Sequence, residues 1–210
     1  MKRFVWLVIL AFASTLVFAC SGAVNEASSN PSGSEDIGTE SQALSSCYVS
    51  RISLGVWYSQ NDSMWKNVLL GNSSTDTIGN YGCVLTCLSM TYQDQWLTST
   101  TPSQLNSSAK SAGCFGPGSS LIDVSCAINS RGGPHSVTDL GSLSAVATTI
   151  CANRPVMIDV PWGSGHKVLA YGYNGGSTSS ASSYLIVDPW DGTSKYLSIF
   201  GTSTRWRDLN

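Results

Sequence analysis

The chain has little charge and almost no histidine, and both shortages exclude whole classes of function. Lys, Arg, Asp and Glu make up only 11% of its 210 residues, about half the usual share. The formal net charge is −2, and no basic block is present that could bind nucleic acid through its phosphates. The two histidines, His135 and His166, are too few for a His-rich metal centre. We therefore expect no nucleic-acid partner, no metal and no other cofactor.

The N-terminal apolar run is too short to cross a membrane as a helix. It extends from Phe4 to Ala19, or 16 residues, whereas a spanning helix needs about 20. Lys2 and Arg3 place two positive charges directly before it. This arrangement is typical of a secretory signal peptide, which we assign to residues 1–20.

The end of this segment, Val17-Phe18-Ala19-Cys20, is similar to a bacterial lipoprotein signal. Cleavage there would leave Cys20 at the new N-terminus with a lipid attached, and the lipid would anchor the protein to a membrane without spanning it. The alternative is ordinary cleavage after Ala19, which would leave Cys20 as a plain thiol. We expect an exported protein of the bacterial cell envelope, anchored by the lipid or otherwise secreted.

The next segment, residues 21–46, contains no Lys, no Arg and no aromatic residue. Because eight serines and four acids dominate it, it cannot bury enough apolar surface to offset its ordering entropy, and we expect a disordered tether. A short propeptide is the alternative. The remaining residues, 47–210, are enough to form one domain with its own core.

Within this domain the sequence pattern changes from helices to strands. Apolar residues at helical spacing predict helices at residues 83–92, 101–113, 120–128 and 143–150. Capping-box patterns begin the second helix at Thr101 and the third at Ser120. Leu121 is expected on the apolar face of the third helix, and Asn153 is expected to end the fourth. Short apolar or alternating runs then predict strands at residues 156–160, 166–173, 184–188 and 195–200. Helices followed by consecutive strands predict an α+β fold with an antiparallel sheet.

Cys83 is placed where a cysteine can act as a nucleophile. It follows the turn Gly79-Asn80-Tyr81-Gly82 and begins a predicted helix. The unpaired N–H groups and the dipole at a helix N-terminus favour a thiolate, which is the reactive form of cysteine. The alternative is a buried structural cysteine or half of a disulfide.

His166 and Asp188 are candidate partners for such a nucleophile. His166 begins one predicted strand and Asp188 ends the next. A Gly- and Ser-rich loop joins the strands, so we expect antiparallel pairing with residue 166 opposite residue 188 and both side chains on one face. A carboxylate beside an imidazole fixes its tautomer and stabilises its charged form. The three residues would then serve as nucleophile, base and orienting group.

Gln60, in an upstream loop, is a candidate oxyanion donor. Acyl transfer needs hydrogen-bond donors for the oxygen that becomes negative in the tetrahedral intermediate. The backbone N–H of Cys83 can supply one donor, and the side-chain amide of Gln60 can supply a second. Taken alone, a loop Gln is more simply explained as a solvated residue.

Two groups of motifs follow one another along the chain. The first comprises Tyr58-Ser59-Gln60-Asn61-Asp62, Trp65, Thr77-Ile78-Gly79, Gly82-Cys83-Val84-Leu85-Thr86 and Met90. The second comprises Arg154-Pro155-Val156, Gly165-His166, Tyr171-Gly172-Tyr173 and Val187-Asp188-Pro189-Trp190. In order and spacing this set, over about residues 55–192, resembles the bacteriocin-processing (double-glycine leader) peptidase-like family of papain-like cysteine peptidases.

The resemblance implies a papain-like fold, with a helical part that carries the cysteine and an antiparallel sheet that carries His and Asp. It implies Cys83 as nucleophile, His166 as general base and acid, and Asp188 as the orienting residue, with Gln60 as oxyanion-hole donor. Transporter-linked members of the family carry a membrane domain that binds leader peptides. This sequence has no such domain, so we do not expect leader processing as its task.

The other cysteines are expected to be structural. Four of them, an even number, predict two disulfides in an exported protein: Cys47, Cys114, Cys126 and Cys151. Three connectivities are open, and no C-x-x-C spacing supports a zinc site. Cys87, one helical turn after Cys83, is expected to be a small buried filler, since a disulfide between the two would strain the helix and disable the nucleophile.

Trp162 and Trp190 lie close in sequence to His166 and Asp188. Either could wall a groove for a peptide or a glycan, and the alternative is that they pack the core. The combined expectation is an exported cysteine peptidase or amide hydrolase that acts on a peptide or protein. The alternatives are a catalytically silent peptide- or glycan-binding module, and a transglutaminase or amidase on the same fold.

Overall fold

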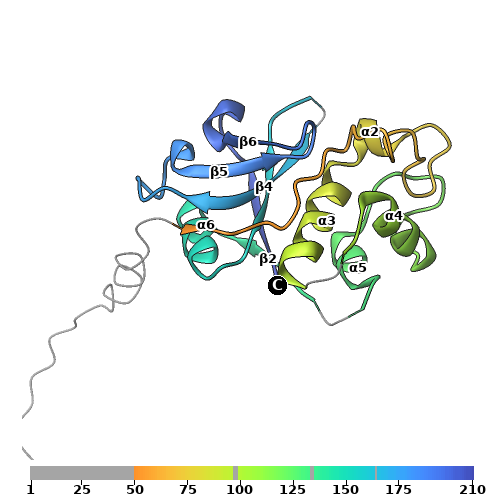
Figure 1. The fold of residues 1–210 in the computed structure, drawn as a ribbon, viewed down its shortest axis with the longest axis horizontal. Helices are drawn as coiled ribbons and strands as arrows, with labels where there is room; N and C mark the ends of the chain where they lie inside the picture. Colours follow the sequence, from red (N-terminus) through yellow and green to blue (C-terminus); the bar gives the residue numbers. More distant parts are fainter. Residues whose placement is uncertain (1–49, 97–98, 133–134, 164) are drawn as a thin grey trace, which may run out of the picture. The chain divides into compact units, whose positions relative to one another are not determined.

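The computed structural model describes residues 50–96, 99–132, 135–163 and 165–210. The predicted signal peptide and tether, with Cys20 and Cys47, lie outside the described residues. All described residues belong to the unit of the chain that begins at Ile37. Figure 1 shows this unit as a helical part beside a sheet part.

Among the described residues, four α-helices belong to the helical part, and α6 lies with the sheet (Figure 1). The helices are α2 (Ile78–Tyr81), α3 (Cys83–Gln95), α4 (Pro102–Ser111), α5 (Val124–Asn129) and α6 (Leu143–Cys151). The predicted capping box of α4 is confirmed, because the Thr101 hydroxyl accepts from the Gln104 N–H and the Gln104 side chain accepts from the Thr101 N–H. Asn153 has φ 60 directly after α6, which agrees with its predicted role in ending that helix.

The helix predicted at residues 120–128 starts later than expected. Asp123 is its N-cap and accepts a hydrogen bond from the Cys126 N–H, so α5 begins at Val124. The hydroxyl of Ser120, which was expected to cap the helix, donates to Asp76 Oδ2 at 2.5 Å. Leu121, expected on the buried face, is 82% exposed. The wrong prediction therefore comes from assigning the cap to a serine that has a distant partner.

The sheet has seven strands, and every strand pair is antiparallel. The strands are β1 (Ser50–Arg51), β2 (Val137–Leu140), β3 (Val156–Val160), β4 (His166–Tyr173), β5 (Tyr184–Asp188), β6 (Thr193–Tyr196) and β7 (Arg205–Leu209). The order is β2-β7-β3-β4-β5-β6, with β1 paired to β4. The predicted α+β class with an antiparallel sheet is confirmed.

Three strand predictions match the structure at both ends, namely β3, β4 and β5. The fourth is right only for Lys195 and Tyr196, because pairing with β5 already resumes at Thr193 and residues Leu197–Phe200 form the 3₁₀ helix η2. The cause is the tight turn after Asp188, in which Asp191 accepts from the Thr193 N–H and Gly192 takes φ 70. The sequence does not predict strand β7, because its charged residues obscure the alternation of apolar and polar side chains.

The core lies between the helices and the sheet. Helix α3 contacts β4, and α6 contacts β1, β2, β3, β4 and β7. Buried residues occur on nearly every face of α3, including the hydroxyl residues Ser89 and Thr91. Each of these hydroxyls donates to the backbone carbonyl four residues earlier, to Leu85 and Cys87 respectively, so burial leaves neither donor unpaired.

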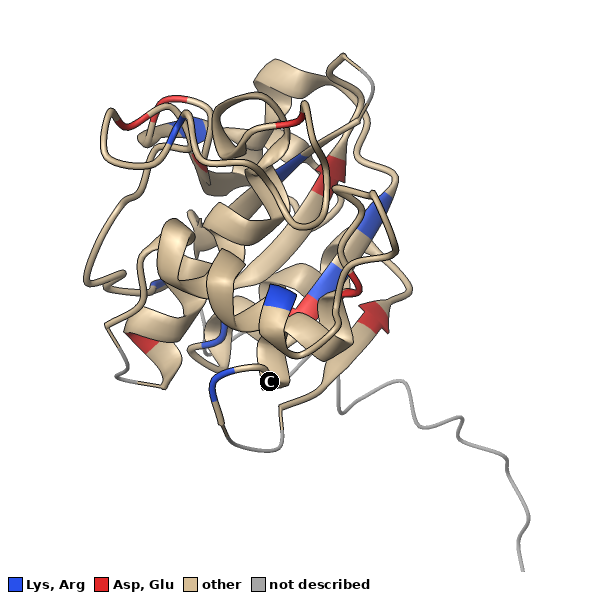
Figure 2. Cartoon of the chain, turned by 90° about the vertical axis from the view of Figure 1, so that its right-hand side faces the viewer, with Lys and Arg blue, Asp and Glu red and all other residues tan. Residues whose placement is uncertain are grey.

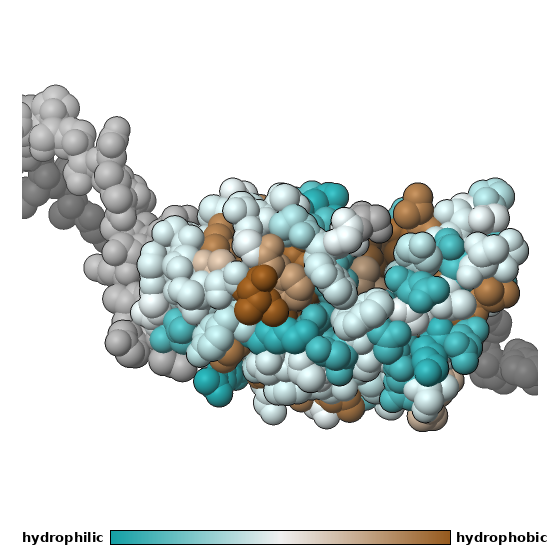
Figure 3. Space-filling view, turned by 90° about the horizontal axis from the view of Figure 1, so that it is seen from above, coloured by the Kyte–Doolittle hydropathy of each residue, from teal (hydrophilic) through white to brown (hydrophobic). Residues whose placement is uncertain are grey.

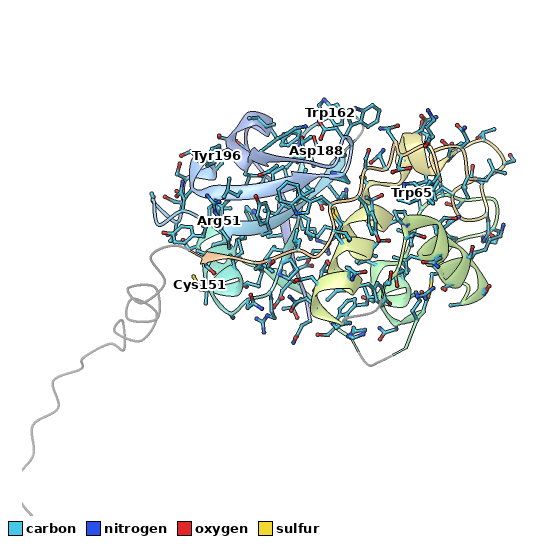
Figure 4. All side chains as sticks on the ribbon, viewed as in Figure 1. Arg51, Trp65, Cys151, Trp162, Asp188 and Tyr196 are labelled. Carbon is cyan, nitrogen blue, oxygen red and sulfur yellow. A yellow bond between two sulfur atoms is a disulfide. The ribbon has the colours of Figure 1, made fainter. Side chains whose placement is uncertain are left out.

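A disulfide joins Cys114 to Cys126, so one of the pairings that the sequence left open is present. It ties the segment after α4 to helix α5. Cys151, at the end of α6, is also disulfide-bonded (labelled in Figure 4). Charges of both signs are sparse on the face in Figure 2. No helix within the described ranges is long and apolar enough to span a bilayer.

Candidate active site

Cys83 is the first residue of α3, as the sequence predicts. Helix α2 runs into α3 through Gly82, whose N–H donates to the Ile78 carbonyl. A Cβ at position 82 would lie 2.4 Å from that carbonyl oxygen, so only glycine fits at this junction. The junction places Cys83, a residue that is 9% exposed, in the first turn of the helix, where backbone N–H groups lack partners within the helix.

His166 is the first residue of β4 and lies between Cys83 and Asp188. Its Nε2 is 2.7 Å from Asp188 Oδ1, and the imidazole lines the same pocket as Cys83, close enough for the cysteine to raise the pKa of His166. The residue is only 4% exposed. Burial would lower the pKa of His166, but the hydrogen bond to Asp188 and the neighbouring Cys83 outweigh it and the pKa is raised. The protonated imidazole is thus favoured between the two partners.

Asp188 ends β5, but the expected register is wrong by two residues. Leu169 pairs with Val187, so one further step of the ladder brings residue 168, not His166, opposite Asp188. His166 lies two residues before that position and therefore keeps the same face of the sheet. The side chains meet diagonally across the two strands, which is within reach of an imidazole and a carboxylate.

The Asp188 carboxylate is buried, at 2% exposure, and three donors hold it. Oδ1 accepts from His166 and from the Trp190 N–H at 2.9 Å, and Oδ2 accepts from Lys195 Nζ at 2.6 Å. Burial would raise the pKa of Asp188, but hydrogen bonds from His166, Lys195 and the Trp190 N–H lower it to about 2. Asp188 is therefore ionised at neutral pH.

Lys195 is a site residue that the sequence reasoning missed. On β6, Thr193 pairs with Asp188 and Lys195 pairs with Ile186, so Lys195 and Asp188 share a face of the sheet. The ammonium group bridges Asp188 and Asp191, the latter at 2.7 Å. A short hairpin from Asp188 to Lys195 would have revealed this pair, but the strand was predicted too late in the chain.

Gln60 is buried, at 1% exposure, and lines the same pocket as Cys83 and His166. Its Nε2 donates to the Gly79 carbonyl at 2.7 Å, and its Oε1 has no hydrogen-bond partner among the described residues. The second N–H of the amide remains for another acceptor. The Gln60 backbone N–H donates to the Pro189 carbonyl at 2.6 Å, which ties this loop to the turn after Asp188.

Two pockets meet at Cys83. One, of about 210 Å³, includes Gln60, Asn80, His166, Trp162 and Trp190 in its lining. The other, of about 330 Å³, is lined mainly by apolar side chains and does not include His166. Tyr81, Cys83 and Gly165 line both. Cys83 is therefore open to a groove in which a chain could pass across the sulfur.

Trp162 and Trp190 wall the smaller pocket and do not belong to the core. They are 42% and 40% exposed. The ring of Trp162 lies edge-on to His166 at 4.8 Å and to Trp190 at 5.2 Å. Trp162 and Asp188 lie at the same end of the sheet (Figure 4). The groove interpretation therefore fits these two residues, whereas Trp65, 4% exposed, packs in the core.

Cys87 is fully buried and is not bonded to Cys83, as expected for a small filler. Its thiol faces the Lys167 carbonyl at 3.7 Å. Burial, followed by the neighbouring Cys83 and acidic groups, raises the pKa of Cys87 well above its usual range. Cys87 is thus an inert thiol one helical turn from the exposed groove.

Comparison with known proteins adds no identification: no protein-family model, curated protein or solved structure matches the chain. Within the described ranges, no three His, Cys, Asp or Glu side chains lie close enough together to hold a metal ion. Any function proposed for the site therefore rests on the chemistry of the site's own residues.

Proposed function

We propose that the chain is a thiol-dependent amide hydrolase, a papain-like cysteine peptidase exported to the cell envelope. The observation that carries this proposal is the hydrogen bond of His166 to Asp188, with Cys83 beside the imidazole in the lining of an open groove. A nucleophile, a base and a group that orients the base are the parts that covalent amide hydrolysis needs.

In this mechanism the Cys83 sulfur attacks the substrate carbonyl carbon, and His166 holds the proton taken from the thiol. The carbonyl oxygen becomes negative and is stabilised by the Cys83 N–H and the free N–H of Gln60. His166 then protonates the leaving amine, and the C–N bond breaks to leave a thioester on Cys83. Water, deprotonated by His166, hydrolyses the thioester and restores the enzyme. Asp188 keeps the imidazole oriented throughout.

The position of His166 assigns the two pockets to the two halves of the substrate. The leaving amine must reach the imidazole that protonates it, so the leaving group occupies the pocket that His166 lines, beside Trp162 and Trp190. The acyl part of the substrate then occupies the larger pocket, which Cys83 lines and His166 does not. Peptide is the substrate class that fits a groove continuing on both sides of the sulfur.

A catalytically silent peptide- or glycan-binding module is the second candidate, and the exposed Trp162–Trp190 pair favours it. The two functions differ in what Cys83 does. A silent module needs the groove but not the thiol, whereas a hydrolase loses its activity when the sulfur is removed.

Cleavage of a complex peptide library, read by mass spectrometry, tests the proposed function. The full-length protein is compared with Cys83→Ala and with Cys87→Ala as the matched cysteine control. We expect cuts with the wild type and with Cys87→Ala, and none with Cys83→Ala. A wild type that produces no cuts beyond those of Cys83→Ala would contradict the proposal.

A further inference from the structure

The acyl-side pocket contains charge of one sign only. Its walls are apolar, and part of the apolar surface is open, since Leu121 is 82% and Tyr81 54% exposed. The charged residues in its lining are Lys167 and Arg207, and none of the described residues that line it is acidic. Hydrophobic surface also appears in separate patches on the face seen in Figure 3.

The acids that pair with these cations lie outside the lining of the pocket. Asp159 accepts two hydrogen bonds from Arg207, at 2.9 and 3.2 Å, and lies 3.3 Å from Lys167 Nζ. Asp139 is held by Arg205 at 2.6 Å and is 3.8 Å from Arg207. Two of these three cations line the pocket, whereas neither carboxylate does.

Lys167 is the cation that is placed to meet a substrate. Its side chain is 22% exposed, against 10% for Arg207, and its contact with Asp159 is the longest of the three made by that carboxylate. A Cβ at Gly165 would lie 4.0 Å from the Lys167 ammonium. Gly165 precedes His166 and lines both pockets, so the ammonium lies beside the point where they meet.

We propose that the acyl-side pocket selects a peptide with an acidic residue at the first or second position before the cleaved bond, with Lys167 as the carboxylate partner. Arg207, fixed by Asp159, supplies a second positive charge behind it. This inference rests on the proposed function, since it assigns a substrate class to that same groove. A charge-assisted hydrogen bond in a partly desolvated pocket discriminates strongly against a neutral side chain of equal size.

Paired affinity labels test the specificity directly at Cys83 and require no natural substrate. Peptidyl acyloxymethyl ketones are made with Glu or Gln at the first position, and in a second pair at the second position. The rate constant for alkylation of Cys83 in the full-length protein is measured by peptide mapping. At one of the two positions we expect the Glu label to react at least about tenfold faster than the Gln label, the discrimination expected for a charged hydrogen bond.

Variants then assign the preference to the lysine. Lys167→Met should bring the Glu-to-Gln ratio to within about twofold, and Lys110→Met, an exposed lysine on α4 away from the groove, should leave it unchanged. In the Lys167→Met variant, the Asp159 carboxylate still has Arg207 as its ion-pair partner. If that variant does not fold, the wild-type ratio in low and in 1 M salt still decides, since screening should reduce an electrostatic preference.

The failure of this proposal is distinguishable from failure of the proposed function. Equal rates for Glu and Gln labels at both positions, with labelling of Cys83 still dependent on His166, would overturn the acidic specificity and leave the hydrolase intact. A Glu preference that persists in Lys167→Met and in high salt would also overturn the role of Lys167. Labelling of Cys83 that does not depend on His166 would overturn the proposed function itself.

Discussion

Two carboxylates of the same sheet, Asp188 and Asp159, each bind two basic side chains, yet their surroundings differ. Asp188 binds His166 and Lys195, and its His166 also contacts Cys83. Asp159 binds Arg207 and Lys167, and no hydrogen bond joins either of these cationic side chains to a cysteine among the described residues. Under the proposed function, the Asp188 cluster orients a base, whereas the Asp159 cluster sets the charge of a pocket.

The largest difference in activity between the two clusters is expected when Asp188 is replaced. Asp188→Asn should lower the rate of peptide hydrolysis by about four orders of magnitude, as loss of the orienting carboxylate does in a Ser-His-Asp triad. Asp159→Asn should leave hydrolysis of a neutral peptide within about threefold and increase the preference for acidic peptides, because it removes a negative charge beside Lys167. Steady-state kcat/KM for neutral and acidic peptides measures both. Equal losses in the two variants would show that the two clusters do not differ in role.

Gln60 belongs to the Asp188 side of the comparison, because the Gln60 N–H donates to the Pro189 carbonyl in the turn after Asp188. Gln60→Ala should lower kcat for peptide hydrolysis by about a hundredfold, the usual cost of one oxyanion donor. Alkylation of Cys83 by iodoacetamide forms no oxyanion, so its rate should change by less than about threefold. If both rates fell together, Gln60 would have a structural role and not a catalytic one.

Replacement of Lys195 is expected to have the smallest effect on kcat/KM, and the size of that effect should depend on pH. Its hydrogen bond helps to lower the pKa of Asp188, so Lys195→Met should raise that pKa. The acid limb of the pH profile of kcat/KM should then move to higher pH, with about tenfold lower activity at acidic pH. Lys195→Arg should keep most of the wild-type activity at acidic pH. A neutral-pH loss with no shift of the acid limb would indicate that Lys195 acts only in folding.

The same pKa shift has a consequence for stability. A carboxylate whose pKa is lowered on folding contributes stability that is present above its unfolded pKa, about 3.9. For Asp188 this contribution is lost as the pH falls towards its folded pKa of about 2. Denaturant unfolding between these pH values should therefore show a smaller loss of stability in Lys195→Met than in the wild type.

The sequence predicts which helix and strands carry Cys83, His166 and Asp188 better than it predicts how these side chains are held. Cys83 could be placed because the glycine turn and the helix start are local signals, and β4 and β5 because short apolar runs lie between turn residues. The diagonal contact of His166 with Asp188 could not be predicted, since the register depends on an irregularity between Ala170 and Gly172.

Other features depend on contacts between residues that are distant in the chain. Strand β7 is stabilised by the ion pair of Arg207 with Asp159, 48 residues earlier, and its charged residues do not read as a strand. Ser120 does not cap the predicted helix, because its hydroxyl donates to Asp76, 44 residues away. Such long-range polar pairs leave no periodic signal in the sequence, and the cationic pocket that results from them was missed for that reason.

The pH dependence of Cys83 alkylation tests the central claim most directly. The full-length protein and His166→Ala are treated with iodoacetamide from pH 5 to 9, and the rates at Cys83 are measured by mass spectrometry, with His135→Ala as the matched histidine control. If His166 stabilises the thiolate, the wild type and His135→Ala should react at pH 6 nearly as fast as at pH 8, and His166→Ala should not. A wild-type rate that rises only near pH 8.5, the pKa of a free thiol, and that His166→Ala does not change, would contradict the account.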